Sequence, residues 1–122
     1  MDMKKIFEDK RGYIYLVEDL FEGGKEFTFL EIKKGFARGG CLHSKDEYIV
    51  VLKGSITFIC GDVEEVLKKG DSRKISAEEP HAFIALEDSI VSEWGITSKD
   101  KKMDRKNSEL RAKVDKINEN NS

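Results

Sequence analysis

The sequence predicts an all-β barrel or sandwich that ends in a short helix. Runs of β-branched and aromatic residues recur about every eight to twelve residues, with turn signals between them. No helical period connects these runs between Tyr13 and Thr97. At 122 residues the chain is long enough for one domain and too short for two. We therefore expect a β-barrel over residues 1–97, followed by a charged helix or tail over residues 98–122.

The expected strands follow one another along the first part of the chain. They cover residues 13–17, 27–32, 48–52, 55–60, 63–67, 81–86 and 89–97. Glycines such as Gly54, Gly61 and Gly70 stand between them, because glycine permits the backbone angles that tight turns need. This order of strands and turns, without helices between them, is typical of all-β domains.

The last part of the chain differs in composition, with many charges and few apolar residues. Leu110, Val114 and Ile117 are spaced by four and three residues, which predicts a short amphipathic helix. Two alternatives stay open for this helix: weak docking on the barrel, or pairing of two subunits. Residues 118–122 are polar and terminal, so we expect them to be disordered.

Charge and hydropathy exclude several classes of partner. A net charge of −2 gives no overall attraction to nucleic acid or to an anionic membrane. The lysines have no aromatic residues interleaved with them, so we expect no nucleic-acid binding. No apolar run approaches the length of a membrane span, and the start leads into no signal-type segment. We therefore expect no membrane partner and a cytoplasmic location.

The two cysteines, Cys41 and Cys60, are too few for a disulfide framework and are expected to be thiols. Cys60 lies in an apolar run, Ile56 to Cys60, where a buried and inert side chain is the simplest interpretation. Cys41 has a different context, because a histidine and a glutamate follow it closely.

Cys41, His43, Glu47 and His81 form the group of residues that indicates chemistry. On an extended strand Cys41 and His43 point to the same face, and Glu47 keeps that parity after a short turn. His81 starts a later apolar strand, and the chain contains only these two histidines. Thiolate, imidazole and carboxylate are all ligands of transition metals. The pattern therefore predicts one pocket.

The same residues resemble the first sequence motif of the cupins. That motif reads Gly, five residues, His, any residue, His, three or four residues, Glu, six residues, Gly. Here Gly35, Cys41, His43, Glu47 and Gly54 stand at those spacings, with Cys41 in place of the first histidine. The resemblance implies a cupin fold, that is, a double-stranded β-helix or jelly-roll barrel.

The second cupin motif is matched less completely. It reads Gly, five residues, Pro, any residue, Gly, two residues, His, three residues, Asn. Gly70 and His81 fit, whereas Ser76, Glu78 and Ala85 stand where proline, glycine and asparagine would be. Two motifs in order strengthen the resemblance, which covers residues 35–85.

A further resemblance is to cupins that act on nucleotide-linked sugars. The segments Asp9-Lys10-Arg11-Gly12 and Arg38-Gly39-Gly40-Cys41-Leu42-His43 look like those of dTDP-4-keto-6-deoxyhexose 3,4-ketoisomerases and, more distantly, dTDP-4-dehydrorhamnose 3,5-epimerases. Such enzymes need no metal. In the ketoisomerases, paired histidines are thought to shuttle protons. Cys41 and His43 occupy those positions here.

The leading interpretation is thus a pocket enzyme of carbohydrate metabolism that isomerises or epimerises a nucleotide sugar without a cofactor. His43 would be the acid and base, because an ordinary imidazole titrates near neutral pH, and Glu47 would orient it. Arg11 and Arg38 would contact the anionic substrate. His81, Phe83 and Trp94 would complete the substrate-binding pocket. The thiol of Cys41 is a poor proton shuttle, which weakens this activity more than it weakens the fold.

The alternative is a metal-binding cupin that acts as a different enzyme or as a small-ligand binding protein. Cys41, His43, Glu47 and His81 would then hold Zn, Fe, Mn or Ni, since a thiolate replaces an imidazole as a ligand at little cost. A third alternative is an empty barrel that these residues merely line. Under either functional interpretation the partner is a small molecule in the barrel.

We also expect a homodimer. The resemblance to cupins implies one, and apolar strands with exposed edges require cover. The strand with Tyr48, Val50 and Leu52 is an example.

Overall fold

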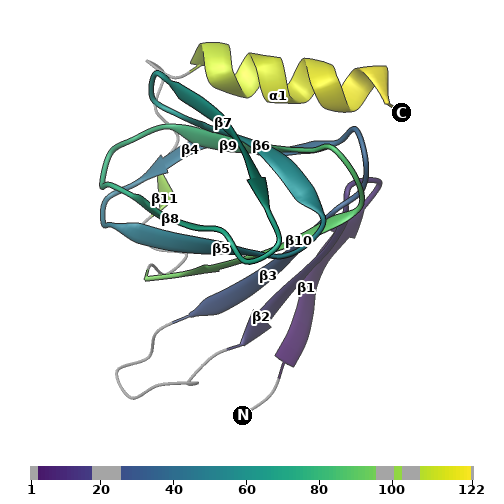
Figure 1. Ribbon diagram of the computed structural model, residues 1–122, viewed down its shortest axis with the longest axis horizontal. Helices are drawn as coiled ribbons and strands as arrows, with labels where there is room; N and C mark the ends of the chain where they lie inside the picture. The colour runs from purple at the N-terminus through teal and green to yellow at the C-terminus, as the bar shows by residue number, and fades with distance from the viewer. Residues whose placement is uncertain (1–2, 18–25, 96–100, 103–107, 122) are drawn as a thin grey trace.

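Two antiparallel sheets form a barrel, as the sequence predicts (Figure 1). The computed structural model describes residues 3–17, 26–95, 101–102 and 108–121, without the side chains of Cys41, Lys101, Lys102 and Ser108. The described strands are β1 (Met3–Asp9), β2 (Gly12–Val17), β3 (Phe27–Ile32), β4 (Ala37–His43), β5 (Glu47–Lys53), β6 (Ser55–Cys60), β7 (Val63–Lys68), β8 (Ser72–Ile75), β9 (His81–Ala85), β10 (Ser89–Trp94) and β11 (Lys101–Lys102). The helix is α1 (Ser108–Asn120).

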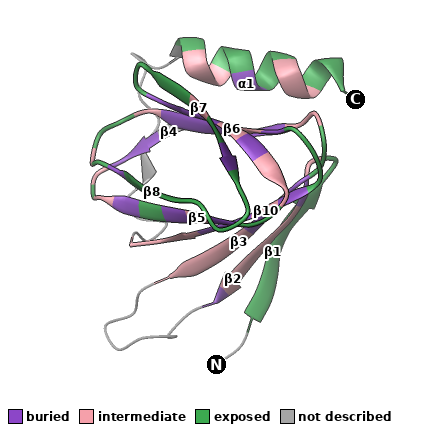
Figure 2. Cartoon of the chain, viewed as in Figure 1, coloured by how far each residue is buried: buried purple, intermediate pink, exposed green. Residues whose placement is uncertain are grey.

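The six-stranded sheet has the order β1-β2-β3-β10-β5-β8, and the five-stranded sheet has the order β11-β4-β9-β6-β7. The core lies between them, because alternate residues of each strand point inward. Along β5 this alternation buries Ile49 and Val51, and along β9 it buries Phe83 and Ala85. Figure 2 shows the buried residues on the strands that enclose the barrel, while β1 is exposed along its whole length.

All seven expected strands are present, and the all-β prediction is confirmed. The extended strand assumed for Cys41 and His43 is β4. The prediction missed β1 and β8, whose sequences are rich in charged and polar residues. Both are edge strands, and each pairs with one neighbour, β2 or β5. Pairing, rather than local apolar content, makes these segments extended. The boundary at residue 97 stays a prediction, and β11 places a two-residue strand beyond it.

Helix α1 packs along the outside of the five-stranded sheet (Figure 1). The three apolar residues that predicted it, Leu110, Val114 and Ile117, pack with Ala37 and Ala82. Of the two alternatives for the helix, the structure shows the first, docking on its own barrel, and a role in subunit pairing stays a prediction. No helix within the described ranges combines the length and apolar character needed to cross a bilayer.

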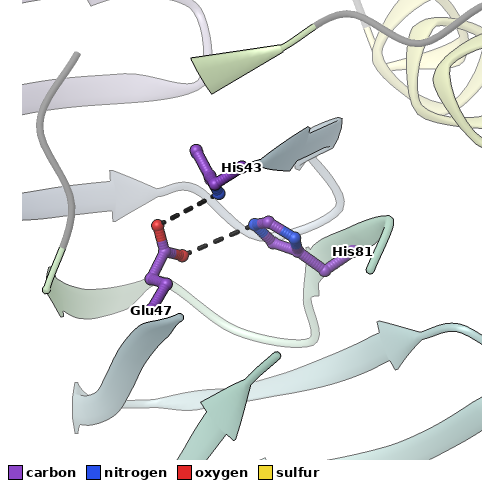
Figure 3. A group of neighbouring side chains, drawn as sticks. All are labelled: His43, Glu47 and His81. Carbon is purple, nitrogen blue, oxygen red and sulfur yellow. Dashed lines mark ion pairs between the residues drawn. The ribbon is translucent and has the colours of Figure 1, made fainter. Parts of the chain in front are cut away.

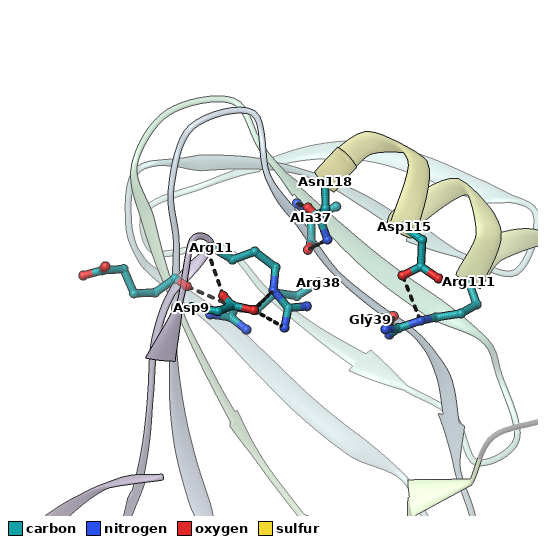
Figure 4. Close-up of polar contacts among 9 residues, drawn as sticks. Asp9, Arg11, Ala37, Arg38, Gly39, Arg111, Asp115 and Asn118 are labelled. Atoms are coloured by element: carbon teal, nitrogen blue, oxygen red, sulfur yellow. Dashed lines mark hydrogen bonds and ion pairs between the residues drawn. The ribbon is translucent and has the colours of Figure 1, made fainter. Parts of the chain in front are cut away.

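Side chains of α1 also complete the hydrogen bonds at the edge of β4 (Figure 4). On this side of β4, strand β11 pairs only with Leu42 and His43. Further along, Asn118 accepts from the Ala37 N–H at 2.7 Å and donates to the Ala37 carbonyl at 2.9 Å, and Arg111 donates to the Gly39 carbonyl at 3.0 Å. The Asn118 amide thereby replaces the peptide group of a neighbouring strand.

The expected disorder of residues 118–122 is wrong for the described part of this segment. Asn118 lies within α1, and Asn121 donates to the carbonyls of Gly35 and Ile117. This order could not be predicted from the sequence, because polar terminal residues become ordered only when a barrel edge offers them backbone partners.

We expect Asn118→Ala to lower the free energy of unfolding by about 1–2 kcal/mol, because two partly buried hydrogen bonds to the backbone are lost. Urea denaturation would measure the change. Asn120→Ala is the matched control, since Asn120 is exposed on the same helix. An equal effect of the two substitutions would contradict the proposed edge pairing.

Candidate metal centre

Three buried side chains converge inside one end of the barrel: His43 from the end of β4, Glu47 from the start of β5 and His81 from the start of β9 (Figure 3). Their exposed fractions are 7%, 0% and 2%. Glu47 Oε2 lies 3.4 Å from His43 Nδ1, and Glu47 Oε1 lies 3.4 Å from His81 Nε2. The centroids of the two imidazole rings are 5.1 Å apart.

The strand period explains this convergence. Glu47 shares the inward face of β5 with Ile49 and Val51, and His81 shares the inward face of β9 with Phe83. The turn at residues 44–46 reverses the chain within three residues, so that His43 and Glu47 meet across it. The predicted convergence of His43, Glu47 and His81 is present in the structure.

This donor set fits a metal ion. One potential ligand atom from each residue lies within 4.8 Å of the others. Nitrogen and carboxylate ligands bind transition metals at about 2.0–2.2 Å, so neighbouring ligand atoms lie roughly 3 Å apart. The two distances of 3.4 Å from Glu47 are close to that value. A carboxylate with no exposed surface also requires positive charge or hydrogen bonds around it, and a divalent cation would supply the charge.

The side chain of Cys41 lies outside the described part of the chain. Its backbone belongs to β4, where residue 41 is the cross-strand partner of His81. The prediction that Cys41 is a fourth metal ligand therefore stays a prediction.

The backbone of Glu79 determines which nitrogen of His81 faces Glu47. His81 Nδ1 lies 3.1 Å from the Glu79 carbonyl oxygen. A carbonyl can only accept a hydrogen bond, so Nδ1 carries a proton, and in the neutral imidazole Nε2 then presents its lone pair on the side of Glu47. A hydrogen bond of this kind is the usual outer support of a histidine that binds a metal.

Phe83 lies next to His81 on the side of the core. Its ring is 5.9 Å from the His81 ring and 5.8 Å from the Phe58 ring, and only 1% of the residue is exposed. The predicted position of Phe83 in the pocket wall agrees with this packing. Apolar contact on one side lowers the local dielectric constant, which strengthens electrostatic interactions with a ligand.

Arg11 and Arg38 are brought together with Asp9, not with the histidines (Figure 4). Arg11 bonds the Asp9 carboxylate at 2.8 and 2.9 Å. Arg38 is buried, and its Nε donates to the Glu31 carbonyl at 3.1 Å. Burial and then the charge of Arg11 lower the Arg38 pKa to about 10. Among the described residues, Arg38 Nη2 has no hydrogen-bond partner.

Arg38 and His43 are separated along β4. Five residues of strand correspond to roughly 15 Å of backbone, so these two residues lie at different ends of β4. On β9 the cross-strand partner of Arg38 is Phe83, two residues from His81. A ligand that touched both Arg38 and His43 would have to be elongated.

Trp94 lies on the outer face of the six-stranded sheet. Its ring stacks between Phe27, at 5.5 Å, and Tyr48, at 6.0 Å. Trp94 and Tyr48 are cross-strand partners, and Tyr48 is 39% exposed, whereas its neighbour Glu47 points inward. The structure therefore does not bring Trp94 to the predicted pocket. Tyr48 belongs to the strand that we expect a second subunit to cover, and the homodimer stays a prediction.

Two residues near the histidines, Asp46 and Glu79, were not singled out in the sequence, and a third, Cys60, is the buried free thiol that the sequence predicts. Asp46 accepts a hydrogen bond from the Ala77 N–H, which with Lys74 holds the Asp46 pKa below its ordinary value. Cys60 donates to Glu79 Oε2 at 3.1 Å. Only the cross-strand partnership of Cys60 with His81, visible once the strands are paired, could have pointed to it.

Comparisons with known proteins agree with this geometry. The sequence model of the cupin domain family matches residues 28–94. No curated protein sequence matches the chain.

Oxalate decarboxylase from Bacillus subtilis is similar in structure, with a TM-score of 0.72 and 18% identity over 84% of this chain and 30% of that one. The capsular polysaccharide assembling protein CapF from Staphylococcus aureus gives a TM-score of 0.67 and 17% identity, over 83% of this chain and 32% of that one. This chain thus spans about a third of each, and the likeness concerns the fold.

We expect the Cys60 thiol to resist alkylation in the folded protein. Burial and the hydrogen bond to Glu79 raise the Cys60 pKa to about 12, so almost none of it is thiolate at pH 8. Mass spectrometry after iodoacetamide treatment of Cys41→Ala, in which Cys60 is the remaining cysteine, would measure the rate. The unfolded variant in urea is the control and should react at least ten times faster. Equal rates would contradict the burial of Cys60.

Proposed function

This chain belongs to the cupin family, and from that premise we propose that it is a metal-binding cupin in which His43, Glu47 and His81 hold a divalent transition metal. One observation supports this proposal above the others. Glu47 is fully buried, and each of its oxygens faces the nitrogen of a different imidazole at 3.4 Å. Two imidazoles and one carboxylate are a common ligand set for a metal that keeps open positions.

The donor types favour Mn, Fe or Zn, since imidazole and carboxylate suit these ions. If Cys41 joins as a fourth ligand, the sulfur shifts the preference toward Zn or Fe. A solved structure of Bacillus subtilis oxalate decarboxylase, described for its Mn(II) centres, has a TM-score of 0.69 and 18% identity over 82% of this chain. That comparison supports a cupin barrel as a scaffold for such an ion.

The bound metal would supply a Lewis acid for an oxygen-donor ligand. Two neutral imidazoles and one carboxylate leave a divalent ion with a net positive charge, so the proposed substrate class is a small anionic or carbonyl-containing molecule. The residues of the chain itself have defined tasks. Glu47 compensates the charge, the Glu79 carbonyl fixes the tautomer of His81, and Phe83 excludes water from one side.

We expect the purified protein to bind close to one equivalent of Mn²⁺, Fe²⁺ or Zn²⁺ per chain. His81→Ala and Glu47→Gln should each weaken binding at least tenfold, because a ligand is lost from a three-residue set. Isothermal titration calorimetry and elemental analysis would measure affinity and stoichiometry.

Glu64→Gln is the matched control for Glu47→Gln, since Glu64 is exposed on β7. Metal should also raise the melting temperature of the wild type and not that of His81→Ala, because a ligand that binds only the folded state stabilises it. A wild-type protein that neither binds these ions nor shows a thermal shift would refute the proposal.

A second candidate function is metal-free isomerisation or epimerisation of a nucleotide-linked keto sugar. The pair His43–Glu47 supports it, because a carboxylate beside an imidazole orients a group that could remove a proton next to a ketone and return one to the neighbouring carbon. The paired guanidinium groups of Arg11 and Arg38 would bind a diphosphate. The separation of Arg38 from His43 along β4 suits an elongated substrate such as a nucleotide sugar.

We expect dTDP-sugars, in the presence of EDTA, to raise the melting temperature of the wild type if this second function is correct. Arg11→Met should abolish the shift, because it removes one of the two guanidinium groups. Arg73→Met is the control, since Arg73 is an exposed arginine on β8 that forms an ion pair with Glu65 on β7. No shift at millimolar nucleotide sugar would count against this candidate.

A further inference from the structure

The three ligand residues of the proposed metal site come from two separate segments. One is the turn that connects β4 to β5, which carries His43 and Glu47 at its two ends. The other is the segment of residues 76–80 that leads into His81. The distance between the two segments determines the distance between His81 and the other two ligand residues.

Two hydrogen bonds join these segments directly. Asp46 Oδ1 accepts from the Ala77 N–H at 2.9 Å, and the Glu78 N–H donates to the His43 carbonyl at 2.8 Å. Asp46 immediately precedes Glu47, and His43 is itself one of the proposed metal ligands. The contacts therefore lie next to the proposed ligands, on adjacent residues of the 76–80 segment.

The backbone of Glu78 is bent to make this junction. Its φ is +66°, and it is the one non-glycine residue with a positive φ in the described ranges. Glu78 stands where the second cupin motif has glycine, which adopts this angle without strain. With this bend, the Glu78 N–H donates to the His43 carbonyl while the carbonyl of the following residue, Glu79, lies against His81 Nδ1.

The 76–80 segment is also held on its opposite side. The Glu79 carboxylate accepts from the Cys60 thiol at 3.1 Å, and the Pro80 carbonyl accepts from the Gly61 N–H at 3.1 Å. The end of β6 thus fixes one side of the segment, and Asp46 and His43 fix the other. Two of these contacts, that of Asp46 with Ala77 and that of Cys60 with Glu79, are made by side chains that can be replaced without altering a ligand of the proposed site, and only the first joins the segment to the turn between β4 and β5.

We propose that Asp46 is a positioning residue for the metal site: its carboxylate, bonded to the Ala77 N–H, sets the position of His81 relative to His43 and Glu47. The role in metal binding rests on the function proposed above. The effect of Asp46 on the position of His81 does not rest on that function, because the hydrogen bonds involve no metal.

The hydrogen bond to Ala77, rather than the ion pair with Lys74, is the contact assigned here. Lys74 Nζ lies 3.4 Å from Asp46 Oδ2 at the protein surface. Exposed ion pairs of this kind contribute little. Lys74→Met, which removes the ion pair and keeps the Ala77 contact, is therefore the matched control.

The first experiment measures Mn²⁺ and Zn²⁺ affinity by calorimetry for four variants whose folding is checked by circular dichroism. Asp46→Ala should weaken binding about tenfold, as loss of outer support for metal ligands commonly does. Asp46→Asn keeps an oxygen acceptor and should restore most of the affinity, and Lys74→Met should match the wild type. Asp46→Ser, whose hydroxyl reaches less far, should resemble Asp46→Ala and replaces it if the alanine variant does not fold.

Wild-type affinity in Asp46→Ala or Asp46→Ser would overturn the proposal. Equal weakening in Lys74→Met would do the same, since the ion pair would then be the cause. Failure of Asp46→Asn to restore binding would show that charge, not the hydrogen bond, is needed, and would also overturn it.

The second experiment requires no metal. The chain has two histidines, both in this site, so the imidazole nitrogen signals in an NMR spectrum report on the site alone. The wild type should show His81 with its proton fixed on Nδ1, and Asp46→Ala should show averaging between tautomers. If the wild type binds no metal, the proposed function fails while this spectrum still decides the role of Asp46. An unchanged His81 signal in Asp46→Ala would refute that role.

Discussion

The burial of the Glu47 carboxylate between two imidazoles is the interaction on which the rest of the site depends. A carboxylate without exposed surface is costly unless its charge is compensated, and here each oxygen faces a ring nitrogen at 3.4 Å. A neutral imidazole that presents a lone pair to the carboxylate does not compensate its charge, and the arrangement is therefore suited to a cation shared by the three residues. The buried charge and the proposed metal site thus require the same three residues to meet.

Closure of the barrel creates this geometry. Glu47 belongs to the six-stranded sheet through β5, whereas His43 and His81 belong to the five-stranded sheet through β4 and β9. The site therefore exists only where the two sheets meet, at the end of the barrel where β4 passes into β5 (Figure 3). Packing of Phe58 against Phe83 keeps the interior apolar just beside the polar group.

The outside of the barrel supports the strand that carries His43. Helix α1 packs against Ala37 and Ala82, and Asn118 completes the hydrogen bonds of Ala37 at the edge of β4. Gly40 permits this close approach, since its φ is +89° and a Cβ atom there would lie 2.8 Å from the backbone of Arg111. The C-terminal segment, whose sequence is mostly polar, is thus part of the framework behind the site.

The sequence predicted the apolar strands, and it predicted that His43 and Glu47 meet, because side-chain direction on a strand has a period of two and the turn between these residues is short. The place of His81 beside them was implied by the spacing of the two cupin motifs. The sequence could not assign Trp94 to the outer face, join Arg38 to Asp9 and Arg11, or order Asn118. Each of these depends on which strand or edge lies alongside, a relation between residues distant in the chain. These positions, and the contacts of Asp46, follow from the tertiary structure, because cross-strand register and the bend at Glu78 arise only when the barrel closes.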